Sequence, residues 1–263
     1  KEGKALVRIF SGKFGFIAAS TPNIESAMQK HAELGERYLR LDYDADSHRK
    51  ELTKRAIQGT EDEGQMRATL NEAGHSFLNH YILAVDEMKA RGETIEVPEW
   101  FQNKLTSLAD TFTRLRTPVQ VDKYENMPYE AVPEFGGRVG KALLMLAKGH
   151  ALLDGRKQLE QEDYDILVRL SVDGLPWQRK RILKACLAED EALTTSQLNS
   201  MTAIPTSSLR RELIGLQQLQ VVSNNESKEW GLLPEVKDKL ISNEMAVGLE
   251  ITHSTNLSPI GAS

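Results

Sequence analysis

Apolar residues recur at steps of three and four along most of the chain, which is the periodicity of amphipathic helices. Glycine and proline interrupt this periodicity and divide it into separate segments. The pattern therefore predicts a mainly α protein with a few strands. The segments expected to be helical are residues 23–34, 46–58, 65–91, 99–116, 137–150, a stretch with Glu162 and Asp163 as its acidic N-terminal cap, and 177–188.

Two short segments near the start of the chain have the pattern of strands instead. The run KFGFIAAST at 13–21 is apolar, ends in two hydroxyl residues and stops at Pro22, which is typical of a buried strand. Ligands bind at the C-terminal ends of strands in open α/β sheets, so Ser20 and Thr21 stand at a candidate ligand edge. The later run ERYLRLDYD predicts a second strand through Tyr38, Leu39, Leu41 and Tyr43.

The segment YILAVDE at 81–87 offers an apolar run followed by Asp86 and Glu87, which is the pattern of a strand that presents metal-binding carboxylates. Its surroundings, residues 65–91, keep the spacing of a helix throughout. We therefore expect a helix here and no catalytic strand.

A second unit is predicted to begin after Gly174-Leu175-Pro176. Thr194 to Gln197 cap a short helix that runs through Met201, and Pro205 opens another that runs to about Gln218. Two strands at 221–223 and 230–233 then flank a polar turn, and a helix at 234–241 closes the unit. Three helices and a hairpin in this order resemble a winged-helix domain. The tail beyond Asn243 lacks sustained periodicity and is expected to be loosely ordered.

The third helix of this unit carries the candidate nucleic-acid contacts. The candidates are Ser207, Ser208, Arg210 and Arg211 on that helix and Lys228 on the wing, from which side chains reach phosphates or base edges. Residues 176–240 hold nine lysines and arginines against eight aspartates and glutamates, so any contact with DNA must be local. Winged helices also dock proteins, and that alternative stays open.

A helix with an arginine in its first turn precedes this unit. The sequence FGGRVGKALLMLAKGHALLDGR, with Arg138 in that turn, resembles the small helical lid of an AAA+ ATPase. Together with KFGFIAAST and LGERYLRLDY, the order of segments is similar to the second half of an AAA+ module of the minichromosome-maintenance branch. The alternative is that Arg138 is an ordinary exposed helix arginine.

This resemblance implies roles for several residues. Ser20 or Thr21 would occupy the sensor-one position, which orients the attacking water, and Arg138 the sensor-two position against the nucleotide. Arg37 would be the arginine finger, which stabilises transition-state charge in the nucleotide site of a neighbouring subunit. A finger that acts on a neighbour requires a homo-oligomer or an equivalent complex.

The phosphate-binding loop G-x-x-x-x-G-K-[ST] is missing from this chain, because Gly12-Lys13 and Gly140-Lys141 lack both the upstream glycine and the following hydroxyl. ATP and magnesium would therefore bind mostly outside the chain. We expect either that the chain is the C-terminal part of a longer polypeptide or that another subunit supplies the phosphate loop. The chain is expected to take part in ATP hydrolysis only when such a phosphate loop is present upstream or in a partner subunit.

Composition adds a few limits. The net charge is −5, 27% of residues are charged, and no apolar stretch is long enough to span a bilayer, so we expect a protein that is not in a membrane. A single cysteine, Cys186, excludes an intramolecular disulfide and favours the cytoplasm. His75 and His80 do not share a helix face well, and no metal site is predicted.

The expected organisation has five parts: 1–58, strands and helices of a partial α/β AAA+ core; 59–134, a helical insertion and connector; 135–175, the lid; 176–243, the winged helix; and 244–263, a flexible tail. The expected function is the C-terminal portion of an oligomeric AAA+ ATPase that acts on nucleic acid. The alternative is a non-catalytic winged-helix transcriptional regulator or adaptor whose helical region binds a partner.

Overall fold

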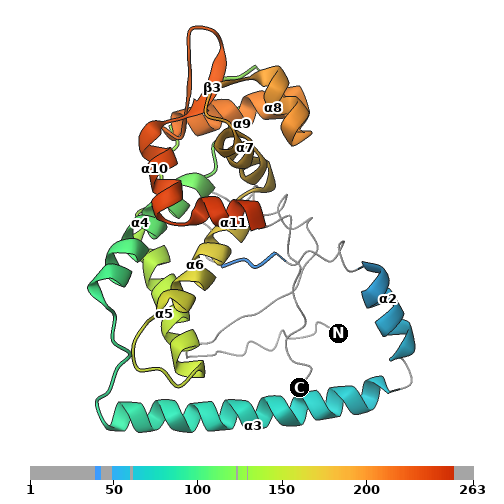
Figure 1. The fold of residues 1–263 in the computed structure, drawn as a ribbon, viewed down its shortest axis with the longest axis vertical. Helices are drawn as coiled ribbons and strands as arrows, with labels where there is room; N and C mark the ends of the chain where they lie inside the picture. The colour runs from blue at the N-terminus through green and yellow to red at the C-terminus, as the bar shows by residue number, and fades with distance from the viewer. Residues whose placement is uncertain (1–38, 43–48, 60–61, 123, 129, 252–263) are drawn as a thin grey trace, which may run out of the picture. The chain divides into compact units, whose positions relative to one another are not determined.

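The computed structural model describes residues 39–42, 49–59, 62–122, 124–128 and 130–251 (Figure 1). These residues are mainly helical, which confirms the predicted mainly α class. The helices are α2 (Arg49–Gln58), α3 (Glu63–Ala90), α4 (Glu99–Arg116), α5 (Gly137–Leu153), α6 (Gln161–Asp173), α7 (Trp177–Ala188), α8 (Thr195–Thr202), α9 (Thr206–Gln218), α10 (Pro234–Ser242) and α11 (Met245–Ile251). The strands are β1 (Leu193–Thr194), β2 (Val222–Asn224) and β3 (Glu229–Leu232).

The three strands form one antiparallel sheet in the order β1-β3-β2. Leu193 pairs with Trp230, and Val222 pairs with Leu232. Thr194 caps α8 as predicted: its hydroxyl accepts from the Gln197 N–H at 3.3 Å, and the Gln197 side chain accepts from the Thr194 N–H at 2.8 Å. The sheet therefore belongs to the predicted C-terminal unit.

The expected second strand near residue 40 is wrong where the structure describes it. Residues 39–42 are extended but pair with no strand. Arg40 Nη2 donates to the carbonyls of Asp173 at 3.3 Å and Leu175 at 3.2 Å, and the Asp42 N–H donates to Asp173 Oδ2 at 3.2 Å. The turn between α6 and α7 thus takes the hydrogen bonds that a neighbouring strand would have taken. The first expected strand, 13–21, lies outside the described residues.

The segment 81–87 lies in the interior of α3, so the helical interpretation of YILAVDE is confirmed. Asp86 and Glu87 are exposed, and Asp86 lies 3.8 Å from Lys89. The start of the expected loose tail needs correction, because Met245–Ile251 form α11 with Met245 and Leu249 buried. The two buried residues, Met245 and Leu249, make only one step of four, which is too short a pattern to predict a helix. Contacts with α6, α7 and α10 stabilise this helix.

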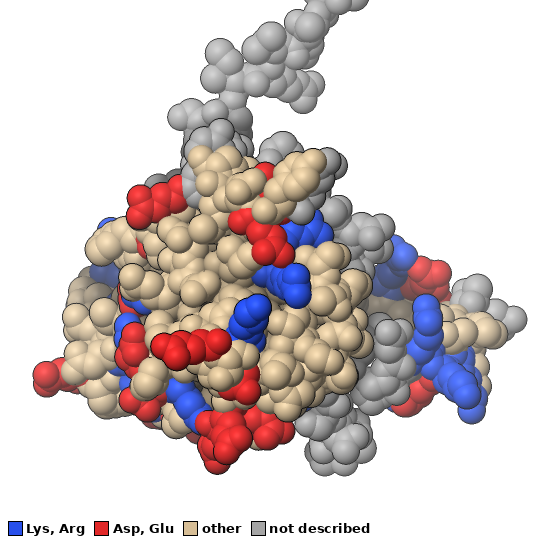
Figure 2. All heavy atoms as spheres, turned by 90° about the horizontal axis from the view of Figure 1, so that it is seen from above, with Lys and Arg blue, Asp and Glu red and all other residues tan. Residues whose placement is uncertain are grey.

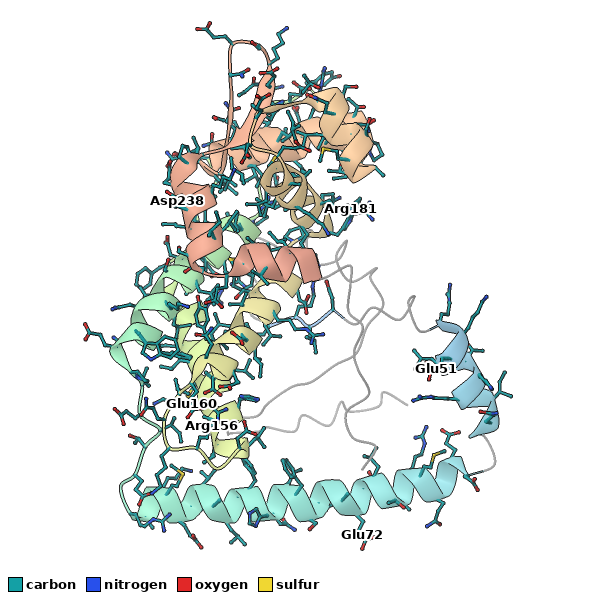
Figure 3. All side chains as sticks on the ribbon, viewed as in Figure 1. Glu51, Glu72, Arg156, Glu160, Arg181 and Asp238 are labelled. Carbon is teal, nitrogen blue, oxygen red and sulfur yellow. The ribbon has the colours of Figure 1, made fainter. Side chains whose placement is uncertain are left out.

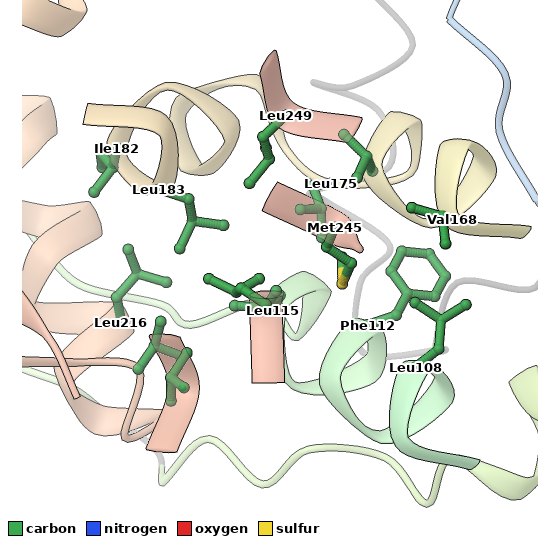
Figure 4. Close-up of a cluster of buried hydrophobic side chains, with 14 of the residues drawn as sticks. Leu108, Phe112, Leu115, Val168, Leu175, Ile182, Leu183, Leu216, Met245 and Leu249 are labelled. Carbon is green, nitrogen blue, oxygen red and sulfur yellow. The ribbon is translucent and has the colours of Figure 1, made fainter. Parts of the chain in front are cut away.

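One continuous core runs from Ile95 to Leu249. Helix α4 packs against α5, α6 and α10, while α11 packs against α6, α7 and α10. Figure 4 shows side chains of α4, such as Phe112 and Leu115, in the same cluster as Leu183 of α7 and Leu216 of α9. The core therefore continues through residue 176, where the sequence pattern suggested that a second unit begins.

A buried arginine joins three of these helices. Arg179 of α7 is 3% exposed. Its Nη1 donates to the carbonyls of Leu115 at 2.7 Å and Thr117 at 2.6 Å, at the C-terminus of α4, and its Nε donates to Glu212 of α9 at 3.1 Å. One guanidinium thus satisfies carbonyls that have no partner within their own helix and fixes α9 relative to α4.

A second buried charge closes the turn between α5 and α6. Asp163 is fully buried and accepts two hydrogen bonds from Arg156, at 2.6 and 2.8 Å. It also accepts from the Glu160 N–H at 2.8 Å and contacts His150 Nδ1 at 2.7 Å. Figure 3 shows Arg156 and Glu160 close together in this turn. Burial alone would raise the pKa of Asp163, but the hydrogen bonds from Arg156, Glu160 and His150 outweigh it and lower that pKa.

Replacing Arg179 is expected to destabilise the protein by about 2–4 kcal/mol, because Arg179→Met leaves the Glu212 carboxylate and two carbonyls without their donor. Urea unfolding followed by circular dichroism measures the change. Lys184→Met, on the same helix, is the control and should stay within about 0.5 kcal/mol of the unchanged protein. Equal effects of the two substitutions would contradict the assigned role of Arg179.

Replacing Asp163 should make stability depend differently on pH. The native pKa of Asp163 lies below that of the unfolded chain, about 3.9, so its stabilisation is present above that pH and is lost as pH falls through the native pKa. Asp163→Asn should therefore cost about 1–3 kcal/mol at pH 7 and progressively less at acid pH. Asp165→Asn, on the exposed side of α6, is the control, and a constant difference across pH would contradict the assignment.

Candidate nucleic-acid interface

Helix α9 presents one polar face to solvent because its apolar side chains occupy the opposite face. Leu209, Leu213 and Leu216 follow steps of four and three and are all fully buried. Pro205 begins the helix, as predicted, and its carbonyl accepts the N–H groups of Ser208 and Leu209, each at 2.9 Å. The burial of this leucine stripe therefore determines which α9 side chains remain available to a partner.

The structure brings most of the predicted contact residues to this outer face. Ser207, Arg210 and Arg211 are exposed, and Ser208 is half-buried. Arg211 Nε donates to the Ser207 carbonyl at 3.2 Å, and Arg210 Nη1 lies 4.0 Å from Glu125 Oε1. The Arg210 pair is solvent-exposed, so a stronger anion such as phosphate can replace the carboxylate at small cost.

Lys228 lies in the turn of the β2–β3 hairpin and is also exposed. Its backbone has φ of 62°, and its N–H donates to the Asn225 carbonyl at 3.0 Å. The Asn225 side-chain oxygen accepts from the Glu229 N–H at 2.9 Å, which closes the turn. Lys228 is thus held at the end of a short, hydrogen-bonded hairpin.

The connection between α4 and α5 runs beside α9, a contact that no sequence pattern predicted. A Cβ on Gly215 of α9 would lie 3.2 Å from Val119 Cβ, so the two segments are in close contact. Asp122 Oδ1 accepts the N–H groups of Tyr124 at 2.7 Å and Asn126 at 2.9 Å, which closes a turn. Glu125 lies within this turn and has a φ of 67°. The spacing Asp122 to Asn126 is the sequence signal that would have suggested such a turn.

Charges of both signs meet around this region. In Figure 2, lysine and arginine side chains lie among aspartate and glutamate side chains on the face that is seen. This agrees with the balanced charge count of residues 176–240. The basic groups of α9 can therefore act only over short distances.

Arg138 lies in the first turn of α5, where the lid resemblance requires it, and its side chain is exposed. It forms an ion pair with Glu134, which also pairs with the buried Arg116 of α4. The two arginines hold the pKa of Glu134 below its usual range, although burial acts to raise it. The other residues of the nucleotide-site prediction, Ser20, Thr21 and Arg37, lie outside the described residues, so their convergence with Arg138 stays a prediction.

The described residues offer little for covalent or metal chemistry. Burial raises the pKa of the Cys186 thiol to about 11, so the thiolate nucleophile is scarce at neutral pH. Nowhere in the described ranges do three or more histidine, cysteine or carboxylate side chains gather to hold a metal ion. Within the same ranges, no helix combines the length and apolarity needed to cross a bilayer.

Comparison of the chain with protein families, with curated proteins and with solved structures finds no match.

Proposed function

We propose that α7 to α10 and the hairpin form a winged helix that binds double-stranded DNA, with α9 as the recognition helix. The support is the order α7, β1, α8, α9, β2, β3 and the antiparallel sheet order β1-β3-β2. The observation that carries the proposal is the outer face of α9. Ser207, Arg210 and Arg211 are exposed there, while the leucine stripe of the same helix is buried in the core.

The proposed contacts divide by chemistry. The guanidinium groups of Arg210 and Arg211 donate in a planar fork, which suits phosphate oxygens and the O6 and N7 atoms of guanine. Ser207 can donate to a phosphate or a base edge, and Lys228 reaches the backbone from the wing. Each neutralised phosphate contributes about −0.9 to the slope of log affinity against log salt. Because the proposed surface has few basic groups, the affinity for DNA should fall only gently as the salt concentration rises.

The small number of basic groups on α9 limits the binding. Glu125 beside Arg210 is displaced when Arg210 meets a phosphate, at little cost because this ion pair is solvent-exposed. Contact with phosphates is therefore weak in general because few charges are available, and base contacts in a preferred sequence would add to it. We therefore expect a low non-specific affinity and a preference for particular sites.

The double substitution Arg210→Ala and Arg211→Ala tests this proposal. Affinity for a duplex, measured by fluorescence anisotropy over a salt series, should fall about tenfold or more, and the salt slope should flatten by about 2. Lys141→Ala with Lys148→Ala on α5 removes the same charge elsewhere and should change affinity less than about twofold. If both double variants bind DNA equally, α9 is not the DNA-binding surface, and a protein-docking role takes its place.

In a second candidate function, the unit formed by α7 to α10 and the hairpin is one part of an oligomeric ATPase. It is favoured by α5 and α6, which pack together directly before α7, with exposed Arg138 in the first turn of α5. In this proposal ATP and magnesium bind to a phosphate loop supplied by another part of the complex. Arg138 contacts the nucleotide in place of Glu134, and Arg37 reaches the neighbouring site.

For this second candidate, Arg37→Ala should abolish most ATPase activity of the assembled complex while nucleotide binding persists, because a finger acts in the transition state. ATP turnover and the binding of a fluorescent ATP analogue are measured in parallel. Unchanged turnover together with unchanged binding would rule out the finger assignment. If the purified chain instead binds no nucleotide, the alternative of a non-catalytic winged-helix regulator or adaptor is favoured.

A further inference from the structure

Helix α3 is the longest helix described, with 28 residues, all of which the structure describes and none of which is buried. Its C-terminal part is half-covered at Tyr81, Ala84, Val85 and Met88. The Tyr81 hydroxyl donates to the Gly149 carbonyl of α5 at 3.2 Å. Among the described residues, the bundle of α4, α5 and α6 therefore contacts α3 near this end.

The N-terminal part of the same face carries large apolar side chains in solvent. Met66, Leu70, Ala73 and Phe77 follow steps of four, three and four, so they form one stripe. Met66 is 51% exposed, Leu70 73% and Phe77 52%. The Phe77 ring stacks on Tyr81, with centroids 5.3 Å apart, which joins this stripe to the covered part. Contiguous apolar surface of this kind marks an interaction site.

We propose that this stripe binds the same stripe of a second copy of the chain, with the two helices antiparallel. The spacing of the stripe is the same read in either direction, so a two-fold axis between Asn71 and Glu72 pairs Met66 with Phe77 of the second copy. The same axis pairs Leu70 with Ala73 of the second copy. A two-fold interface requires such a self-complementary surface.

The flanking charges favour the antiparallel arrangement. In it, Glu63 lies opposite His80 of the second copy, and Arg67 lies opposite Ser76. A parallel pair in register would place Glu63 beside Glu63 and Arg67 beside Arg67, with like charges in contact. In one copy Glu63 and Arg67 already form an ion pair at 2.6 Å, so the rim of the antiparallel interface is balanced. Glu72, labelled in Figure 3, lies about 160° around the helix from Leu70 and leaves the stripe uncharged at its centre.

The antiparallel overlap also avoids the part of α3 that the bundle covers. It uses residues 63–80 of both copies, and the residues from Tyr81 to Met88 of each copy extend beyond Glu63 of the other. At about 1.5 Å per residue the overlap is roughly 27 Å long.

Sedimentation equilibrium of the full chain over a range of concentrations tests the proposal. The unchanged protein should be dimeric, and Leu70→Glu should raise the dissociation constant by about a hundredfold or more, because the charge enters the interface twice. Leu83→Glu is the matched control: Leu83 is 64% exposed, lies outside the 63–80 overlap and is about 140° around the helix from Leu70, so it should not change the association. A monomeric unchanged protein, or equal effects of the two variants, would overturn the proposal.

Cysteine crosslinking tests the direction of pairing independently. Cys186 is buried, so a new cysteine on α3 is the reactive one. Protein with Met66→Cys mixed with protein with Phe77→Cys should form a mixed disulfide dimer. Neither variant alone should form a disulfide dimer, because residue 66 of one copy lies about 16 Å along the helix axis from residue 66 of the other, and the same holds for residue 77. Self-crosslinking of Met66→Cys alone would indicate a parallel pair and overturn the antiparallel arrangement.

Discussion

The described structure depends on one buried guanidinium, that of Arg179. It donates hydrogen bonds to two helices, to the last carbonyls of α4 and to the Glu212 carboxylate of α9. A buried charge is tolerated only when its donors are satisfied, so the three helices must keep their relative positions. The surrounding core, continuous from Ile95 to Leu249, packs the same three helices together.

This constraint determines how the proposed DNA-binding surface is presented. Glu212 points inward to Arg179, while Arg210 and Arg211, directly before it in the same turn of α9, are exposed on the outside. The connection that follows α4 begins at the same carbonyls and places Glu125 beside Arg210. If α9 binds DNA as proposed, a helix held to the bundle in this way would not rotate to optimise the contact, and selectivity would come from its side chains. The proposed dimer through α3 would place two such helices in one assembly.

The sequence predicted elements whose ends are set locally. Helices α4 and α7 begin directly after Pro98 and Pro176 and match the predicted bounds, and the Thr194 cap was evident from its neighbours. The strand expected near Leu41 was wrong because Arg40 and Asp42 bind the α6–α7 turn, about 130 residues away in the chain. Helix α11 was missed for the same reason, since its stability comes from helices far away in the sequence.

The candidate site was predicted in part. Exposure of Arg210 and Arg211 follows from the leucine spacing of α9, which is a local pattern. The partners of Arg138 and Arg210 are Glu134 and Glu125, and only the first is close enough in sequence to be suggested by spacing. The role of Arg179 has no local signal, because its acceptors lie 62 to 64 residues before it.

The most direct measurement of the central claim, that one core holds α9 to the helical bundle, is equilibrium unfolding of three single-tryptophan variants. Trp100 reports on α4, Trp177 on α7 and Trp230 on β3, and in each variant the other two are replaced by phenylalanine. The account predicts, in each variant, that the tryptophan fluorescence and the circular dichroism give the same urea midpoint. A tryptophan at β3 that unfolds well before the helices, while Trp100 follows the main transition, would contradict it.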